Sequence, residues 1–435
     1  MTHAPDTQRA LRATELARAA LREGRIDLAD RIARELDSFG LATRGSWIVV
    51  ARVAAILGRP DVVRHALARA APLAQPETPP VDADLLAAAG EPDPAPPPAP
   101  SSNAHPRYLL IRAWGQGFWS DVSHVIGQVL TAEITGRTPI VHWGANSRFG
   151  AGAQDSNAWN HYFLPVSNGT IADLAGRGLS YFPPKWRDDN LTVRENGALQ
   201  GPYARIGSLA TMRRNEDVVV SDFHTPLAAL RHWIPPWHPL HGASLRAVHA
   251  DLVARFVRPR PEIVERVDRA WAALGPGPFV AVHVRGSDKA VEIRGLKELT
   301  DQYPAHIDAL LASIPGARIL LLTDWEPAVA EYRARYAERV VVTDAQRTAE
   351  RVGLHFQRGL DGRTLGEEVL RDTLLAARCD SFVGLGNSNV SAFIDLFGRA
   401  PTRPRAWTDE TSILVGPHLH ESLSVGLLLP SAPGA

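Results

Sequence analysis

The chain has 435 residues, a length that fits two or three domains. Lysine and arginine together number 47, and so do aspartate and glutamate, so the formal net charge is zero and no overall basic field attracts nucleic acid. Hydrophobic residues at 45% and charged residues at 22% are typical of a globular protein and exclude disorder as its main state. The single cysteine, Cys379, excludes an intramolecular disulfide and a cysteine-rich metal site.

The chain shows no targeting or membrane signal. Its first residues lack the basic and apolar segments of a signal peptide, and no uncharged apolar run reaches the roughly 18 residues of a membrane span. The 16 histidines include no pair with the spacing of a zinc site. We therefore expect a cytoplasmic protein with no membrane span and no bound metal.

Residues 1–75 are predicted to form a helical head. The sequence Gly-Arg-Ile-Asp at 24–27 returns as Gly-Arg-Pro-Asp at 58–61, a shift of 34 residues, and an apolar pattern of matching phase follows each copy. This is the tetratricopeptide period, and a glycine suits the turn between paired helices. The alternative is coincidence in a region rich in alanine and arginine. Since two repeats are fewer than a solenoid needs, we expect the head to pack on other structure, bind a protein partner or self-associate.

A proline-rich linker is predicted over 76–104, because residues 72–100 contain ten prolines and few large apolar side chains. Strands alternating with helices follow, which indicates two Rossmann-like α/β domains over 105–274 and 275–435. In the first domain, strands at 108–111 and 138–142 flank an amphipathic helix. In the second, we expect strands at 279–284, 318–322, 339–343 and 381–384 with helices near 297–313, 326–337, 364–378 and 389–398.

Two further stretches belong to the first domain. A helical stretch over 243–274 separates the two sets of strands. Residues 143–240 read as irregular and rich in aromatic side chains, for which core packing is favoured over a functional role. The aromatic residues in question are Trp159, His161, Tyr162, Trp186, Trp233 and Trp237.

Polar residues follow three of the strands in the second domain. Arg285-Gly-Ser-Asp288-Lys289 follows the first strand, Thr323-Asp324-Trp325 the second, and Gly386-Asn387-Ser388-Asn389 opens the last helix. Ligands of open α/β sheets bind at the carboxyl ends of the strands, and arginine, lysine and a helix N-terminus all suit phosphate. The pattern therefore predicts a nucleotide-diphosphate site. The alternatives are a surface cluster of ion pairs, and a plain helix cap at Ser388.

A glycine-containing loop also follows the first strand of the first domain. Gly115-Gln-Gly117 lacks the third glycine of a dinucleotide fingerprint and has no Walker lysine, which argues against NAD and against a P-loop ATPase. We expect this loop to approach the diphosphate or the sugar from the opposite domain.

These motifs together resemble the α1,6-fucosyltransferases, including the rhizobial Nod-factor enzymes, and their O-fucosyltransferase relatives. The signature His283-Val-Arg285-x-x-Asp288-Lys289 carries most of the likeness. Weaker elements occur in the family's order over residues 107–400: Gly115-Gln-Gly-Phe118, Leu321-Leu-Thr-Asp324, Gly353-Leu-His355 ahead of a helix containing Asp372, and Phe382-Val-Gly-Leu-Gly-Asn387-Ser388-Asn.

The resemblance implies a GT-B fold, in which two Rossmann-like domains face a cleft, here preceded by the all-α head. It also implies metal-independent, inverting transfer from GDP-fucose, with no further cofactor. By carry-over, Arg285 holds the β-phosphate, His283 and Asp372 contact the guanine, Ser388 and nearby backbone bind phosphate, and Asp324 lies in the donor pocket. Lys289, Asn387 and the first loop (Gly115, Gly117, Phe118) complete the implied donor site.

The sequence departs from the family pattern at three points. The family often has two adjacent arginines where this chain has Arg285-Gly286, and the α1,6 members have Thr-Asp-Asp where it has Thr323-Asp324-Trp325. A glutamate follows the signature lysine by four residues in those members, whereas Glu292 follows Lys289 by three. A base must deprotonate the acceptor hydroxyl, and Asp288 and Glu292 are the candidates beside Arg285 for catalysis.

The sequence-based hypothesis is thus a fucosyltransferase that acts on a glycan or protein acceptor. Two alternatives stay open: a transferase that uses another nucleotide-sugar donor, and a non-catalytic binding protein whose repeats recruit a partner. Binding of a GDP-sugar distinguishes the fucosyltransferase hypothesis from both alternatives.

Overall fold

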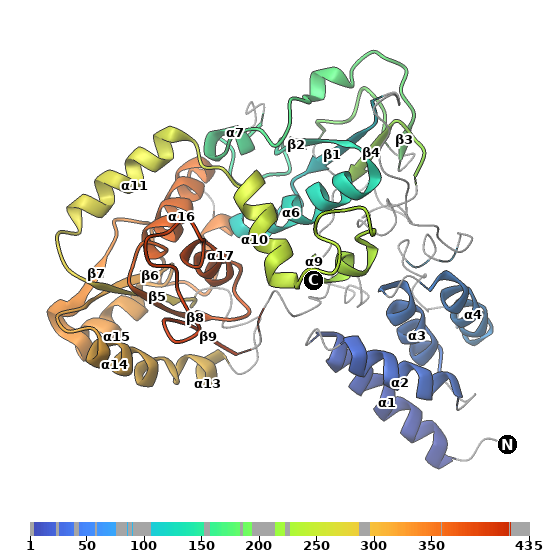
Figure 1. Cartoon of the computed structure of the whole chain (residues 1–435), viewed down its shortest axis with the longest axis horizontal. Coiled ribbons are helices and arrows are strands. Elements are labelled where there is room, and N and C mark those ends of the chain that lie inside the picture. Colours follow the sequence, from blue (N-terminus) through green and yellow to red (C-terminus); the bar gives the residue numbers. More distant parts are fainter. Residues whose placement is uncertain are drawn as a thin grey trace.

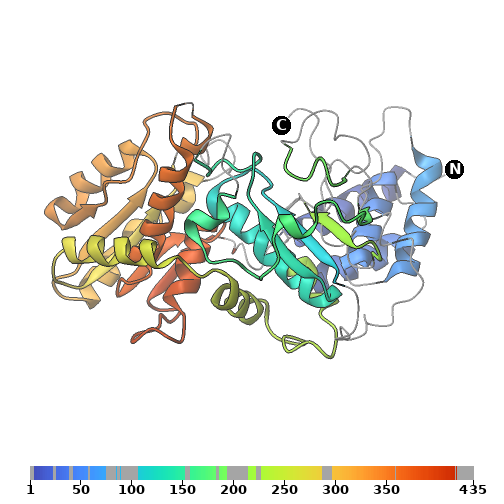
Figure 2. The same ribbon diagram turned by 90° about the horizontal axis from the view of Figure 1, so that it is seen from above.

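The computed structural model describes residues 4–22, 26–38, 43–56, 59–74, 85, 89, 106–151, 157–182, 186–193, 214–221, 227–286, 296–357, 359–416 and 418. They form a helical head followed by two α/β units in a row, with the head at one end and the second unit at the other (Figures 1 and 2). Of the helices in these residues, none combines the length and the hydropathy needed to cross a bilayer.

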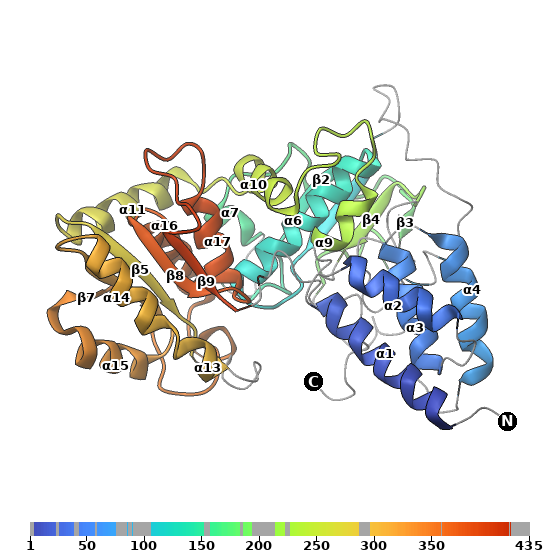
Figure 3. The same ribbon diagram turned by 60° about the horizontal axis from the view of Figure 1, so that its bottom comes forward.

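The head contains four helices in which each packs on the next and α1 also contacts α3. They are α1 (Ala4–Arg22), α2 (Ile26–Ser38), α3 (Arg44–Ile56) and α4 (Pro60–Ala70). Small buried side chains such as Ala17, Ala29 and Ala51 let the helices approach closely, and Thr14 Oγ1 lies 2.6 Å from Ser46 Oγ between α1 and α3. Figure 3 shows the head next to the first α/β unit, on the side of β3, β4 and α9.

The helix bounds agree with the 34-residue shift. Both α2 and α4 begin two residues after the glycine of a repeated motif, at 24 and 58. The turns that hold those glycines lie outside the described residues, and the tetratricopeptide assignment stays a prediction. Of the linker over 76–104, only Leu85 and Ala89 are described; Leu85 is buried, and the Ala89 carbonyl accepts a hydrogen bond from Arg64 at 3.2 Å.

The first α/β unit is built on a four-stranded parallel sheet with the order β2-β1-β4-β3. Its strands are β1 (Tyr108–Arg112), β2 (Thr138–His142), β3 (Tyr181–Phe182) and β4 (Val218–Ser221), and α6 (Phe118–Thr135) connects the first two. The predicted βαβ unit is confirmed. Strands β3 and β4 were not predicted, because they are short and lie in the stretch over 143–240 that has no sustained periodicity.

The second unit has a five-stranded parallel sheet with the order β7-β6-β5-β8-β9. Its strands are β5 (Phe279–Val284), β6 (Arg318–Thr323), β7 (Val340–Val342), β8 (Ser381–Leu385) and β9 (Ser412–Val415). Its helices are α13 (Leu296–Thr300), α14 (Tyr303–Ser313), α15 (Glu326–Tyr336), α16 (Gly362–Ala376) and α17 (Asn389–Gly398). The four predicted strands are confirmed, and β9 is an addition. The predicted helix over 297–313 is broken into α13 and α14.

Two helices bridge the units (Figure 1). The helical stretch expected over 243–274 divides into α10 (Leu245–Phe256) and α11 (Pro261–Ala273), on either side of a segment that contains Pro259. Helix α10 packs on α6 of the first unit, whereas α11 packs on α16 of the second, where Arg378 pairs with Asp268 at 2.6 Å. The first domain was expected to extend to 274, and that boundary stays a prediction; α11, which lies before it, contacts α16 of the second unit.

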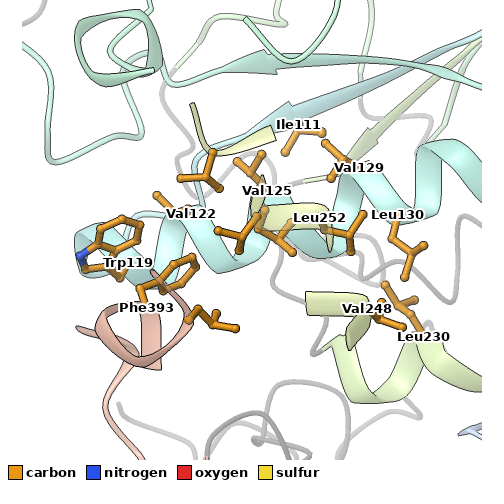
Figure 4. Packing of buried hydrophobic residues seen from close by; sticks show 14 of the residues in the cluster. Ile111, Trp119, Val122, Val125, Val129, Leu130, Leu230, Val248, Leu252 and Phe393 are labelled. Carbon is orange, nitrogen blue, oxygen red and sulfur yellow. The ribbon is translucent and has the colours of Figure 1, made fainter. Parts of the chain in front are cut away.

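A continuous apolar core runs from the first sheet through α6 into the second unit. Figure 4 shows Val122, Val125 and Val129 of α6 on the side of Ile111, with α10 on another side of the helix and Phe393 of α17 against Trp119. The rings of Trp119 and Phe393 stack with centroids 4.3 Å apart, and Trp119 Nε1 donates to Thr373 Oγ1 at 2.8 Å. The two units therefore share a buried apolar interface.

The core also takes up aromatic residues of the irregular stretch. Trp159 and Tyr162 are buried in this core and Trp186 in a separate apolar cluster of the first unit, which confirms the core-packing interpretation for these three. Trp233 is half-buried against the first of these cores. Tyr162 in addition donates to the Phe149 carbonyl at 2.5 Å and lies against the start of α16.

Candidate functional site

The second sheet has a topological switch point between β5 and β8. The chain runs from β5 outward through β6 and β7, and then returns to place β8 and β9 on the other side. Ligands of open α/β sheets bind at the carboxyl ends of strands at such a point, where the diverging connections leave a crevice. The three polar segments picked out from the sequence follow β5, β6 and β8, and they therefore meet at this edge.

Arg285 and Asp324 form an ion pair across the ends of β5 and β6. The register pairs Val284 with Thr323, so the next residue of each strand extension faces the other. Both side chains are 16% exposed, which shields the pair from solvent. The carboxylate fixes the guanidinium at the sheet edge, and charge-assisted contacts of this kind are the strong ones. An ion pair with Asp324 and a role in phosphate binding are thus both consistent with the position of Arg285.

His283 links the two strands of the switch point. Its Nδ1 lies 2.8 Å from Ser391 Oγ in the first turn of α17, and Ser391 Oγ also accepts the Leu385 amide N–H at 3.1 Å. Burial, and then the positive charge of Arg285, lower the pKa of His283 to about 4. The imidazole is therefore neutral at pH 7 and contributes hydrogen bonding rather than charge. Tyr303 Oη donates to the His283 carbonyl at 3.3 Å and holds the strand end.

The start of α17 presents backbone N–H groups at the same edge. Ser388 is the buried N-cap residue, but its side chain makes no capping hydrogen bond, so simple capping by the hydroxyl, the alternative raised from the sequence, is wrong. Within the described residues, no donor reaches the buried Oδ1 of Asn387. The unpaired N–H groups of a helix N-terminus attract an anion. The start of α17 thus lies at the same edge as the Arg285–Asp324 ion pair, whose two charges balance.

Asp372 belongs to a different cluster. It lies on α16, where its Oδ2 accepts from Thr343 Oγ1 at 2.7 Å and its Oδ1 pairs with Arg371 at 3.0 Å. Arg371 also pairs with Asp344, directly after β7, at 2.6 Å. Burial raises the pKa of Asp372 against the lowering effect of Arg371. Strand β7 is the outer neighbour of β6, so these contacts hold Asp372 beside the cluster of His283, Arg285 and Asp324 rather than within it.

The loop Gly115–Gly117 faces the second unit, as the sequence led us to expect. Gly115 takes a φ of +83°, which glycine tolerates. A Cβ on Gly117 would lie 3.9 Å from His355 Cε1, in the segment Leu354–Phe356 of the second unit. Arg148 Nε donates to the Gly115 carbonyl at 2.8 Å, and its guanidinium lies 4.4 Å from the centre of the Phe356 ring.

Two details of this loop bear on the donor-site roles expected for Gly115, Gly117 and Phe118, which stay predictions. The N–H groups of Gly115 and Gln116 donate to Asp121 Oδ1 at 3.1 and 3.2 Å, so the chain's own carboxyl group occupies donors that a phosphate would use. The ring of Phe118 is buried among Trp119, Phe149 and Tyr162. Burial raises the pKa of Asp121 to about 8.

Asp288, Lys289 and Glu292 lie outside the described residues, and their roles stay predictions. Conversely, sequence reasoning missed Ser391 and Asp121. Ser391 could have been found as the residue one helical turn after Ser388, on the same face of α17. Asp121 could have been found as the acidic residue in the first turn of α6, next to the glycine loop.

No protein-family model matches the chain, and no curated protein matches it. Solved structures similar to it include NodZ α1,6-fucosyltransferase soaked with GDP-fucose, with 18% identity, a TM-score of 0.45, and coverage of 67% of this chain and 93% of that one. Fucosyltransferase NodZ from Bradyrhizobium shares 16% identity over 68% and 94% of the two chains, with a TM-score of 0.46. POFUT1 in its apo form shares 14% identity over 73% and 100%, with a TM-score of 0.45. The NodZ structures are of fucosyltransferases.

Proposed function

We propose that this protein is a glycosyltransferase that moves fucose from GDP-fucose to a glycan or protein acceptor. The observation that carries the proposal is the cluster at the switch point of the second sheet: Arg285 paired with Asp324, a neutral His283, and the start of α17. These residues belong to the segments whose motifs resemble those of the fucosyltransferases.

The chemistry of the leaving group explains why such a cluster is suitable. When the glycosidic bond to fucose breaks, negative charge grows on the diphosphate of GDP. A preorganised guanidinium and helix N–H groups stabilise that charge in the transition state and need no reorganisation at the moment of reaction. Asp324 keeps Arg285 in place before the donor binds. His283 is neutral, so it adds no positive charge of its own beside Arg285.

The acceptor side of the reaction completes the proposal. An acceptor hydroxyl attacks the anomeric carbon from the face opposite to GDP, so the configuration inverts, and a carboxylate removes its proton. Asp288 and Glu292 are the candidate bases on the motif resemblance, with Lys289 as a further phosphate contact. We propose that no metal takes part, and that the Arg285 guanidinium and the N–H groups at the start of α17 are the groups that bind the diphosphate.

A thermal-shift panel with GDP, UDP, ADP and CMP tests the donor, because a ligand that binds only the native state raises its melting temperature. We expect stabilisation by GDP alone, unchanged by EDTA. Stabilisation by UDP but not GDP would support a transferase with another donor, and no response to any nucleotide would favour the non-catalytic binding protein. Release of fucose from GDP-fucose, with the anomer of the product read by NMR, then tests the enzyme class and inversion.

The head is proposed to bind a protein partner or to mediate self-association. Its position beside the first unit, the acceptor-side domain in this proposal, supports such a role (Figure 3). Removal of residues 1–100 tests it by size-exclusion chromatography and by transfer to the acceptor. An unchanged oligomeric state together with an unchanged acceptor activity would leave the head without this role.

A further inference from the structure

Two of the positions at which the sequence departs from the fucosyltransferase pattern face each other in the structure. The register that pairs Val284 with Thr323 brings Gly286 opposite Trp325, one residue beyond the Arg285–Asp324 ion pair. A Cβ on Gly286 would lie 2.7–2.9 Å from atoms of the Trp325 side chain. That separation is shorter than any real Cβ contact, so the indole occupies the volume in which a side chain at 286 would sit. The glycine and the tryptophan are therefore one complementary pair.

Trp325 is itself held from several directions. Its backbone N–H donates to Thr323 Oγ1 at 3.1 Å. The flanking backbone is bonded to Thr348: the Thr348 N–H donates to the Asp324 carbonyl, and the Glu326 N–H donates to the Thr348 carbonyl, both at 2.9 Å. The guanidinium of Arg351 lies 4.6 Å from the centre of the indole ring, a cation–π distance. The ring is thus fixed against the backbone that immediately follows Arg285.

We propose that Trp325 is a positioning residue for Arg285: its indole packs on Gly286 and holds the strand extension so that the guanidinium stays at the switch point. The inference rests on the proposed function, because Arg285 is the group that binds the donor diphosphate. Without the ring, the backbone at Gly286 gains freedom, and a glycine has more conformations to gain than any other residue. Arg285 would then keep its charge but lose the fixed backbone from which its side chain pairs with Asp324.

Affinity for GDP, measured by calorimetry on the full chain, tests this proposal. We expect Trp325→Ala and Gly286→Ala each to weaken GDP binding by about tenfold, because a hydrogen bond to a charged group contributes on that order. Trp325→Phe keeps a ring against Gly286 and should retain near wild-type affinity. Gly286→Ala acts without removing the ring, so it decides the question if Trp325→Ala is too unstable to assay.

Two double variants separate positioning from general destabilisation. Because Trp325 acts through Arg285, adding Trp325→Ala to Arg285→Ala should cause no further loss of GDP affinity. Because Gly286→Ala acts by displacing the indole, adding it to Trp325→Ala should also cause no further loss. Losses that simply add in both pairs would overturn the proposal, since independent sites are additive and coupled ones are not.

Trp271→Ala is the matched control. Trp271 is a half-buried tryptophan that packs on Phe279 at the opposite end of β5, with ring centroids 5.6 Å apart. The Trp271→Ala substitution should lower the melting temperature and leave GDP affinity unchanged. If Arg285→Ala itself leaves GDP affinity unchanged, the proposed function fails at its first step. If Arg285→Ala weakens binding while a folded Trp325→Ala does not, only the positioning role is wrong.

Discussion

The two α/β units have parallel sheets of similar design but use the ends of their first strands in opposite ways. In the first unit, β1 runs into Gly115–Gly117, whose N–H groups at 115 and 116 bond to Asp121 of the following helix. In the second unit, β5 runs into Arg285, and the helix that meets it at the switch point, α17, begins at Ser388 without a side-chain cap. The first strand end bonds its backbone N–H groups to a carboxyl group of the chain, whereas the second pairs an arginine side chain with a carboxyl group beside a helix start that has no side-chain cap.

This difference shows why a glycine-containing loop after a strand does not by itself indicate an anion site. Backbone N–H groups need acceptors whether or not a ligand is present, and a nearby acidic residue can supply one. The donor site is therefore expected in the second unit, with the first unit contributing its surface rather than its N–H groups. The variants below test this comparison, from the largest expected effect to the smallest.

Trp119→Ala should break the connection on which the comparison depends, because Trp119 joins α6 of the first unit to Phe393 and Thr373 of the second. Truncation of a fully buried tryptophan costs roughly 3–5 kcal/mol of unfolding free energy. We expect chemical denaturation, followed by fluorescence and by circular dichroism, to show that loss. If fluorescence and circular dichroism no longer follow one shared transition, the two units unfold separately. An unchanged free energy of unfolding would contradict the shared core.

Arg285→Ala should abolish the function of the second strand end. Removal of one preorganised donor from a site of developing charge lowers turnover by roughly 10²–10³-fold. Arg285→Lys should recover part of the loss, because lysine keeps the charge but not the fork of donors. Release of GDP from GDP-fucose measures both variants, and the exposed Arg335, which pairs with Asp308 on the outer helices, provides the control variant Arg335→Ala. Full turnover in Arg285→Ala would refute the assignment.

Asp121→Ala, at the first strand end, should lower the stability of the protein and leave its ligand binding unchanged. The variant leaves the N–H groups of Gly115 and Gln116 without their acceptor, and each unsatisfied buried group costs about 1–3 kcal/mol. Asp121→Asn keeps an Oδ1 acceptor and serves as its matched control. We expect the alanine variant alone to unfold at lower urea concentration, with GDP affinity equal to wild type in both. A large loss of GDP affinity in Asp121→Asn would mean that the first loop belongs to the donor site.

The smallest effect over a single pH unit is the pH dependence that Asp121 imparts. Burial raises the pKa of Asp121 to about 8 in the folded protein, so between its ordinary pKa and pH 8 the native state holds a proton that the unfolded state has released. Stability therefore falls as pH rises through this window, by about 1.4 kcal/mol per pH unit for this one group. Urea denaturation of wild type and Asp121→Asn at pH 5, 6, 7 and 8 should show that slope in their difference. Parallel profiles would contradict it.

Much of the second unit was predictable from local pattern. Runs such as Phe279–Val284 and Ser381–Leu385 are apolar because their strands are buried on both faces, and the helices between them repeat their apolar residues at helical spacing. Strands β3 and β4 escaped prediction because two to four residues cannot establish a periodicity. The break between α10 and α11 was visible as Pro259 and Pro261, but the partner of each helix was not.

The candidate site was predictable in its residues and not in its contacts. Motif order placed His283, Arg285 and Asp324 at strand ends, and the structure unites them. The same reasoning treated Phe118 as a ligand contact and Gly286 and Trp325 as two separate departures, whereas the fold buries the first and packs the other two together.

By itself, the sequence determined the order of strands and helices and the chemistry at each strand end, because those depend on neighbours along the chain. Only the tertiary structure decided what each strand end meets: Asp324 for Arg285 at a separation of 39 residues, Ser391 for His283 at 108, and Thr373 for Trp119 at 254. Such partners follow from strand order, register and helix packing, which bring distant residues together through the burial of a common core.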